Sequence, residues 1–332
     1  MNDFESFLIT GGAGFIGSHL AEHLLSRGHR VAVLDDLSTG RSSNIEHLLD
    51  RSGFEFVAHN VASIPTLDRL VKDADVVFHL AANVGVDRVM QEGVLTLETS
   101  AMGTRAVLMA AEKHGAKVMV ASSSEVYGRG VRIPFAEEDD VVIGPSSQPR
   151  WAYAVTKLED EFTALAYHRE RRVPVVILRL FNVVGPRQVG RYGMVLPRFV
   201  AQALKGDDLT VYGSGTQSRT FCDVRDVVEA MVGLAAHPDG TGGVFNLGSD
   251  VELSILELAR LVIDRLGSRS GVQLIPYEDV RPGFEDIERR VPDLTRIRSL
   301  TGWQASTPLS ETIDAVSHEL ADASNSSSKE SD

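Results

Sequence analysis

The segment FLITGGAGFIGSHLAEHLL, residues 7–25, decides the fold of this chain. Its first four residues have the composition of a short buried strand, and the glycine-rich run GGAGFIG follows at once. Beyond Gly17, apolar residues recur at helical spacing through Leu25. The segment therefore predicts a strand, a tight glycine turn and a helix in immediate succession.

The glycines of this turn favour a bound pyrophosphate. They let the backbone approach the ligand closely, and the free N–H groups at the start of the helix stabilise its negative charge. A second predicted strand, residues 30–34, ends in Asp35, close to the roughly 20 residues after the glycines at which a carboxylate binds the ribose hydroxyls. Because that carboxylate would repel a 2′-phosphate, we expect NAD rather than NADP.

Further apolar runs continue this pattern at regular spacing. They are apolar throughout rather than alternating, which is typical of parallel strands covered on both faces. The runs are residues 54–58, 75–80, 116–121 and 173–180. We expect an α/β fold with a Rossmann-type doubly wound parallel sheet, followed by shorter elements that form a smaller α/β substrate-binding domain. We expect residues 1–181 to form the NAD-binding domain, with part of 216–250 added to it. Residues 182–320 are expected to form a substrate-binding domain interleaved with the first, and residues 321–332 to form a disordered polar tail.

The composition of the chain argues against several classes of protein. The 332 residues are 43% hydrophobic and 24% charged, as in a globular protein with a large core. The net charge of -13 argues against nucleic acid as a partner. The single cysteine, Cys222, and the scattered histidines predict no disulfide and no metal site. With no long apolar run and no basic-then-apolar leader, we expect no membrane span and a cytoplasmic location.

A second stretch carries the residue types of a proton-transfer site. Tyr153 and Lys157 are four residues apart in a predicted helix, so their side chains leave the same face. A free phenol has a pKa of about 10, and a nearby ammonium favours the phenolate. Such pairs also occur by chance on exposed helices. Here Ser123, Ser124 and Glu125 follow a predicted strand at the carboxyl edge of the sheet, where α/β folds bind ligands, and we expect Tyr153 to act as a base.

The second half of the chain collects arginines despite the acidic total. Guanidinium groups suit phosphate oxygens because they donate paired hydrogen bonds, although any one of these arginines could equally be a solvated surface charge. The group comprises Arg187, Arg191, Arg198, Arg219 and Arg281. Together they favour an anionic substrate.

The ordered motifs resemble those of the extended short-chain dehydrogenase/reductase family that acts on nucleotide sugars. The matching motifs are GGAGFIG (11–17), Asp35, HLAA (79–82), SSSEVYG (122–128), YAVTK (153–157), LFNVVGPR (180–187) and VYGSGTQSR (211–219). The resemblance implies a tightly held NAD that oxidises a sugar hydroxyl, with Tyr153 as base and Lys157 on the nicotinamide ribose. It also implies a UDP-sugar as substrate.

Site residues follow from the same resemblance. The implied contacts with NAD are Gly11, Gly14, Phe15, Ile16, Gly17, Asp35, Asp36, Asn60, Val61, Leu80, Ala81, Ala82, Tyr153 and Lys157. The implied contacts with the substrate are Asn182, Val195, Arg198, Tyr212, Arg219 and Arg281. Among these, Asn182 and Arg219 would contact the diphosphate, and Arg281 would lie near the nucleotide.

Residues near Tyr153 discriminate between branches of the family. Hexose 4,6-dehydratases carry Asp-Glu before Val-Tyr-Gly and simple 4-epimerases usually lack the glutamate, whereas this chain has Ser124-Glu125. This pair, Arg150 before the tyrosine and Arg290 before a proline resemble the UDP-glucuronic acid decarboxylases. The catalytic set implied is Tyr153, Lys157, Ser123, Ser124, Glu125 and Arg290.

The expected reaction is oxidation at carbon 4 of UDP-glucuronic acid followed by decarboxylation. A ketone beta to a carboxylate accepts the electrons released with carbon dioxide, so the product is a UDP-4-keto-pentose, or UDP-xylose if the hydride returns. Ser123 or Ser124 would bond the carbon-4 oxygen, and Glu125 with Arg290 would position the carboxylate and assist protonation at carbon 5. The alternative is 4-epimerisation of a UDP-hexose or UDP-hexuronic acid.

Some positions depart from the family pattern. Asn60 replaces a common aspartate at the adenine, Ser100 replaces a common asparagine, and residues 83–88 differ from the proline-rich loop of UDP-xylose synthases. The predicted helices at 93–114 and 151–171 are apolar on more than one stripe. We expect them to form a homodimer interface, with core packing as the alternative.

Overall fold

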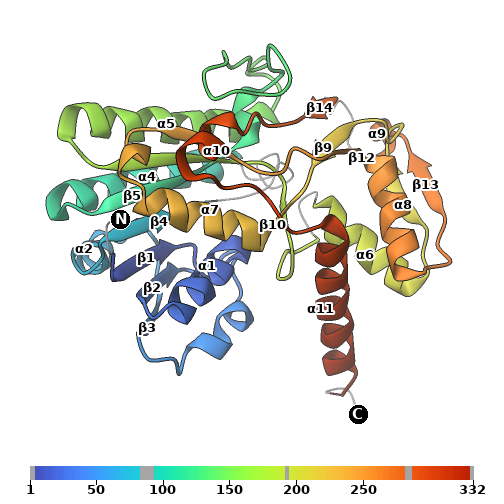
Figure 1. The fold of residues 1–332 in the computed structure, drawn as a ribbon, viewed down its shortest axis with the longest axis horizontal. Coiled ribbons are helices and arrows are strands. Elements are labelled where there is room, and N and C mark those ends of the chain that lie inside the picture. Colours follow the sequence, from blue (N-terminus) through green and yellow to red (C-terminus); the bar gives the residue numbers. More distant parts are fainter. Residues whose placement is uncertain (1–3, 83–92, 191–193, 281–285, 330–332) are drawn as a thin grey trace.

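A seven-stranded parallel sheet forms the centre of the molecule (Figure 1). The computed structural model describes residues 4–82, 93–190, 194–280 and 286–329. Strand order is β11-β6-β5-β4-β1-β2-β3, and every neighbouring pair is parallel. The strands are β1 (Ser6–Thr10), β2 (Arg30–Asp35), β3 (Phe54–Ala58), β4 (Val76–His79), β5 (Lys117–Ser123), β6 (Val175–Leu180) and β11 (Val244–Leu247).

Helices cover both faces of this sheet. One face packs against α1 (Phe15–Ser26) and α7 (Val224–Ala236), with Leu20, Leu24 and Val227 in one buried cluster. The other face packs against α2 (Ile64–Lys72), α4 (Gly93–His114) and α5 (Trp151–Arg171) around a second cluster. Both faces are therefore buried, which explains the continuous apolar strands. The predicted Rossmann-type fold is confirmed.

Strand order reverses between β1 and β4, which lie side by side although two strands separate them in sequence. At such a switch point the loops after the two strands run in opposite directions and leave a crevice at the carboxyl edge. The glycine turn after β1 and the segment after β4 border this crevice. The fold thus fixes the position of a ligand site.

A second region, on the right of Figure 1, packs around its own apolar cluster. Its helices are α6 (Val195–Lys205), α8 (Ile255–Leu266) and α11 (Leu309–Lys329), and β8 (Leu209–Tyr212) pairs with β13 (Val272–Ile275). Shorter elements in the second half of the chain include β7 (Val183–Val184), β9 (Ser218–Thr220), β10 (Cys222–Asp223), β12 (Glu252–Ser254), α9 (Tyr277–Val280), β14 (Arg289–Arg290) and α10 (Thr295–Thr301). Between them the chain returns to the central sheet as β11.

The end of the chain differs from the sequence expectation. Helix α11 runs to Lys329, so residues 321–329 are helical where the polar composition predicts disorder. The first turns of α11 bury Ile313 and Val316 against α6 and α8. Once those turns are formed, each added residue extends the helix at little cost, which composition alone does not reveal. Within the described residues, the helices include none long and apolar enough to cross a membrane.

Candidate active site

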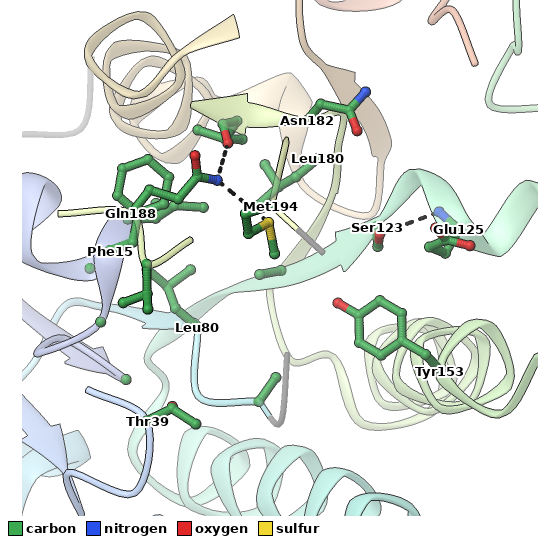
Figure 2. A pocket seen from close by; sticks show the side chains of 18 of the residues that line it. Phe15, Thr39, Leu80, Ser123, Glu125, Tyr153, Leu180, Asn182, Gln188 and Met194 are labelled. Atoms are coloured by element: carbon green, nitrogen blue, oxygen red, sulfur yellow. Dashed lines mark hydrogen bonds between the residues drawn. The ribbon is translucent and has the colours of Figure 1, made fainter. Parts of the chain in front are cut away.

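One cavity of about 690 Å³ lies at the carboxyl edge of the sheet, between the two regions (Figure 2). Every predicted site residue that the structure describes lines it. Those residues are Gly11, Gly14, Phe15, Ile16, Gly17, Asp35, Asp36, Asn60, Val61, Leu80, Ala81, Ala82, Ser123, Ser124, Glu125, Tyr153, Lys157, Asn182, Val195, Arg198, Tyr212, Arg219 and Arg290. Arg281, Arg191 and residues 83–88 lie outside the described residues.

The glycine turn is shaped for a phosphate group. A Cβ at Gly11 would lie 2.7 Å from the backbone nitrogen of Ala81, and one at Gly17 would lie 2.5 Å from the carbonyl oxygen of Gly11. Only glycine fits at these two positions. Helix α1 begins at Phe15, so Gly17 belongs to its first turn, and the N-cap Gly14 offers no side chain to the first N–H groups. These amides are suited to an anion at the cavity wall, so the turn fits a dinucleotide pyrophosphate.

Asp35 ends β2 and is nearly buried beside this turn. Its two carboxylate oxygens accept hydrogen bonds from the backbone N–H groups of Ala13 (2.9 Å) and Leu37 (2.8 Å). Burial raises the pKa of Asp35 more than these bonds lower it. The carboxylate is thus fixed in place by the backbone while still lining the cavity, as a ribose ligand must be.

The cavity wall next to Asp35 is held by side-chain pairing. Asn60 donates from Nδ2 to Asp36 Oδ2 at 2.8 Å and accepts from the backbone N–H of Ala62 at 2.9 Å. An aspartate at position 60 would instead repel Asp36. The amide at position 60 is therefore compatible with Asp36 in a way that the more common aspartate is not.

Tyr153 and Lys157 both project from α5 into the cavity and are almost fully buried. In Figure 2 the Tyr153 ring stands near Ser123, which ends β5. Burial raises the pKa of Tyr153, while the charge of Lys157 and a hydrogen bond with Ser123 lower it. The predicted effect of Lys157 is present, but burial outweighs it, and the net shift is upward.

Glu125 is clamped between two arginines. Its carboxylate lies 2.9 Å from Arg150 Nη2 and 2.7 Å from Arg290 Nη2, and all three side chains are at most 10% exposed. Burial alone would raise the pKa of Glu125, but the charges of Arg290 and Arg150 lower it below its usual value. Arg150 also stacks on the ring of Trp151 at 4.4 Å. This group carries one net positive charge beside Tyr153.

Arg290 reaches the cavity through a two-residue strand. In β14 it pairs with Arg219 of β9, so both guanidinium groups border the cavity. Arg219 Nη2 lies 2.7 Å from Asp286 Oδ1, and burial together with the charge of Arg290 lowers the pKa of Arg219 to about 10. Asn182 donates from Nδ2 to the carbonyl oxygen of Thr220 at 2.9 Å.

The far end of the cavity is aromatic and basic. The guanidinium of Arg198 lies 4.1 Å from the centre of the Tyr212 ring, and Val195 begins α6 alongside. A planar ring with a cation on it is a suitable surface for a nucleobase. Further lining residues that sequence reasoning missed include Ser38, Thr39, Gln188, Met194, Gln217, Tyr277 and Asp286. Gln188 and Met194 show no sequence signal, whereas Asp286 stands in the acidic and basic run DIERR, which could have suggested a partner for an arginine.

Known proteins that are similar to this chain identify its family. Residues 7–248 match the family model described as the NAD dependent epimerase/dehydratase family. A UDP-N-acetyl-alpha-D-glucosaminuronate decarboxylase of Bacillus cytotoxicus is 44% identical over 88% of this chain and 90% of its own. A UDP-glucuronic acid decarboxylase 1 of Danio rerio is 37% identical over 97% of this chain and 75% of its own.

A solved structure shares the whole fold. The UDP-glucuronic acid 4-epimerase of Bacillus cereus, in complex with UDP-glucuronic acid and NAD, has a TM-score of 0.84 and 29% identity, covering 96% of this chain and 99% of its own. These similarities confirm the predicted resemblance to nucleotide-sugar enzymes and the prediction of NAD as cofactor. On these matches and on the glycine turn, the chain belongs to the NAD dependent epimerase/dehydratase family.

Proposed function

We propose that this protein oxidises carbon 4 of UDP-glucuronic acid with NAD and then decarboxylates the sugar, giving a UDP-4-keto-pentose or UDP-xylose. The observation that carries the proposal is the clamped Glu125 beside Tyr153, with Arg150 and Arg290 on its two oxygens. The names of the relatives support it, since two of them are decarboxylases of uronic-acid nucleotide sugars.

The chemistry follows from the residues around the cavity. Bound NAD would supply the hydride acceptor and a positively charged nicotinamide ring. Tyr153 takes the proton of the carbon-4 hydroxyl, and Ser123 or Ser124 holds the carbon-4 oxygen. Lys157, fixed behind the phenol on the same helix, stabilises the phenolate against the effect of burial.

Loss of carbon dioxide then needs little from the protein. The carboxylate beta to the new ketone leaves as carbon dioxide. The electrons of its broken bond to carbon 5 enter the ketone and form an enolate, which the donors at carbon 4 stabilise. The positive charge of the Glu125 group holds the carboxylate before it leaves. Carbon 5 then takes a proton from a water molecule, which the Glu125 carboxylate and the Arg290 guanidinium are placed to orient.

A second substrate is favoured by one observation. The 44%-identical relative is named for an N-acetylated uronic acid, whereas the 37%-identical relative is named for UDP-glucuronic acid. The two sugars differ at carbon 2 and share the carboxylate, so both fit the chemistry above. The 4-epimerase alternative has the support of a similar solved structure but leaves the clamped Glu125 without a role.

The test is product analysis with each UDP-uronic acid. Purified enzyme with NAD should release carbon dioxide and form a UDP-pentose from UDP-glucuronic acid, and the rate with the N-acetylated sugar ranks the two substrates. Formation of UDP-galacturonic acid without carbon dioxide would establish the epimerase alternative instead.

The two regions of the fold would bind different ligands. We infer that residues 1–181, with β11, bind NAD, and that residues 182–320 bind the nucleotide sugar. Support comes from the glycine turn and Asp35 on one wall of the cavity and from Arg219 and Tyr212 on the other. The protein would act in the cytoplasm, consistent with its free, buried Cys222.

A homodimer is proposed from the surface of α4 and α5. These two helices pack side by side and expose large apolar side chains that a second copy would cover. The exposed set is Val94, Leu97, Met102, Met109, Val155 and Phe162. Two helices from each subunit would make a four-helix interface.

A further inference from the structure

Asp160 lies behind Lys157 in the described part of the chain and faces away from the cavity. Lys157 Nζ donates to Asp160 Oδ2 at 3.1 Å and to the carbonyl oxygen of Ala121 at 3.1 Å. The Asp160 side chain is 1% exposed and does not line the cavity. Two of the three ammonium donors are therefore occupied, and Lys157 lines the cavity together with Tyr153.

Both oxygens of Asp160 act as acceptors. Besides Lys157, Ser100 donates to Oδ2 at 3.1 Å and Thr104 donates to Oδ1 at 2.6 Å, both from α4. Ser100 is the position at which the sequence departs from the family's usual asparagine. Here the short hydroxyl fits against a carboxylate that α5 supplies.

The hydrogen bonds that His79 and Thr10 make beyond Thr104 also run toward Asp160. Since the Thr104 hydroxyl hydrogen goes to Asp160, its oxygen accepts from His79 Nε2 at 3.1 Å. The other ring nitrogen, Nδ1, then accepts from the Thr10 hydroxyl at 2.8 Å. This assignment requires a neutral imidazole, and burial lowers the pKa of His79 to about 4. A directed chain of hydrogen bonds thus ends on the Asp160 carboxylate.

Other acids near Lys157 already have arginine partners. Glu161 is paired with Arg179 through two hydrogen bonds of 2.9 and 2.8 Å, and Glu125 is held by its own two arginines on the cavity side. His79 is neutral. Among the ion pairs of the described residues, Asp160 has Lys157 as its partner. It is the acid available to balance this ammonium.

We propose that Asp160 is a positioning residue for the reaction: it serves as the dedicated counter-ion of Lys157, keeping the buried ammonium charged and aimed at Tyr153. The proposal rests on the proposed function for its consequence in catalysis, but not for the ion pair itself. An isolated buried ammonium loses its charge, because desolvation disfavours the protonated form. Burial lowers the pKa of Lys157, yet Asp160 and Tyr153 more than compensate, and the net shift is upward.

The direct test titrates Lys157 by NMR. Protein with ¹³C-labelled lysine is followed through pH in its NAD-bound form, and the Lys157→Met variant assigns the signal. Asp160→Asn, which is nearly isosteric, should lower the pKa of Lys157 by about one unit or more. The matched control is Glu159→Gln, an exposed neighbour on the same helix, which should leave the titration unchanged. An unchanged titration in Asp160→Asn would overturn the proposal.

Kinetics supply the second readout. In Asp160→Asn, kcat should fall about 10-fold or more while KM for the sugar nucleotide changes little, because Asp160 does not touch the cavity. Thr104→Val, which removes one donor, should act in the same direction with a smaller effect and replaces Asp160→Asn if that variant fails to fold. A purely structural Asp160 would lower stability without moving the Lys157 titration.

The proposed function and the role of Asp160 as a counter-ion can be rejected independently of each other. The NMR titration uses no sugar, so it tests the counter-ion even if UDP-glucuronic acid is not the substrate. Wild-type enzyme without decarboxylase activity but with the expected titration would reject the proposed function alone. Decarboxylation with an unchanged Lys157 titration in Asp160→Asn would reject the counter-ion alone.

Discussion

The guanidinium of Arg290 lies 2.7 Å from the carboxylate of Glu125, and both side chains are buried at the edge of the cavity. Arg290 belongs to β14 and Glu125 to the turn η3 (Ser124–Tyr127), so this pair joins the last part of the chain to the central sheet. Arg150 occupies the second carboxylate oxygen. The pair therefore fixes the segment that carries β14 against the proposed decarboxylation site.

Glu125→Gln should destabilise the protein by roughly 3 kcal/mol, because it leaves two buried arginines without their shared carboxylate. It should also abolish most of the decarboxylation. Urea unfolding of both proteins measures the first effect. Glu46→Gln, on the surface away from the cavity, is the control and should leave unfolding within error.

This stability difference should depend on pH. The folded pKa of Glu125 lies below its ordinary value of 4.5, so the contribution is fully present above about 4.5 and is lost as the pH falls through the lowered value. Urea unfolding at about pH 7 and about pH 3 should show a smaller difference between wild type and Glu125→Gln at the lower pH. A difference that grew on acidification would mean that Glu125 is not held as a carboxylate.

Tyr153→Phe should lower kcat by about 100-fold or more, since it removes the general base and leaves the ring in place. Binding of NAD and the melting temperature should stay close to wild type. Tyr167→Phe lies on the same helix outside the cavity and should keep full activity. Turnover that survives in Tyr153→Phe would transfer the base assignment to another residue.

Asp35→Ser should weaken NAD binding by about 10-fold or more, because a hydrogen bond to a charged group is lost. NADP should bind better than it does to wild type, since the repulsion of its 2′-phosphate is gone. Calorimetry with each dinucleotide measures both changes. Asp73→Ser, at an exposed helix end, is the control. Equal loss of both dinucleotides would indicate that Asp35 only braces the glycine turn.

Phe162→Asp should convert the proposed homodimer into a monomer, because a charge would enter the apolar face of α4 and α5. Phe162 is 67% exposed in the single chain. Light scattering measures the mass. Val251→Asp, at a 64% exposed position remote from these helices, should leave the mass unchanged. A wild-type monomer would show that the apolar face has another use.

The sequence was sufficient to predict the elements whose pattern lies within one short stretch of residues. The glycine turn at 11–17, the apolar strands and the long helices at 93–114 and 151–171 each carry their own pattern, and the structure has both helices at those bounds. The loop at 128–150 gave no such signal. It buries Phe135 against Tyr127, and of this loop only Arg150 lines the cavity.

Pairings between distant segments could not be predicted. Strand β14 has two residues, too few for any periodic signal, yet it places Arg290 beside Arg219. Asp160 looks like an ordinary surface acid in a charged helix, and its role emerges only when α4 brings Thr104 against it. The resemblance named Arg290 as a site residue, but its ion pair with Glu125 could be seen only in the folded structure.

The central claim is that oxidation at carbon 4 precedes loss of the carboxylate. It is tested most directly with UDP-glucuronic acid deuterated at carbon 4, by measuring carbon dioxide release from labelled and unlabelled substrate. The account predicts carbon dioxide, a UDP-pentose or its 4-keto form, and slower release from the deuterated sugar. A product that retains all six sugar carbons would contradict it.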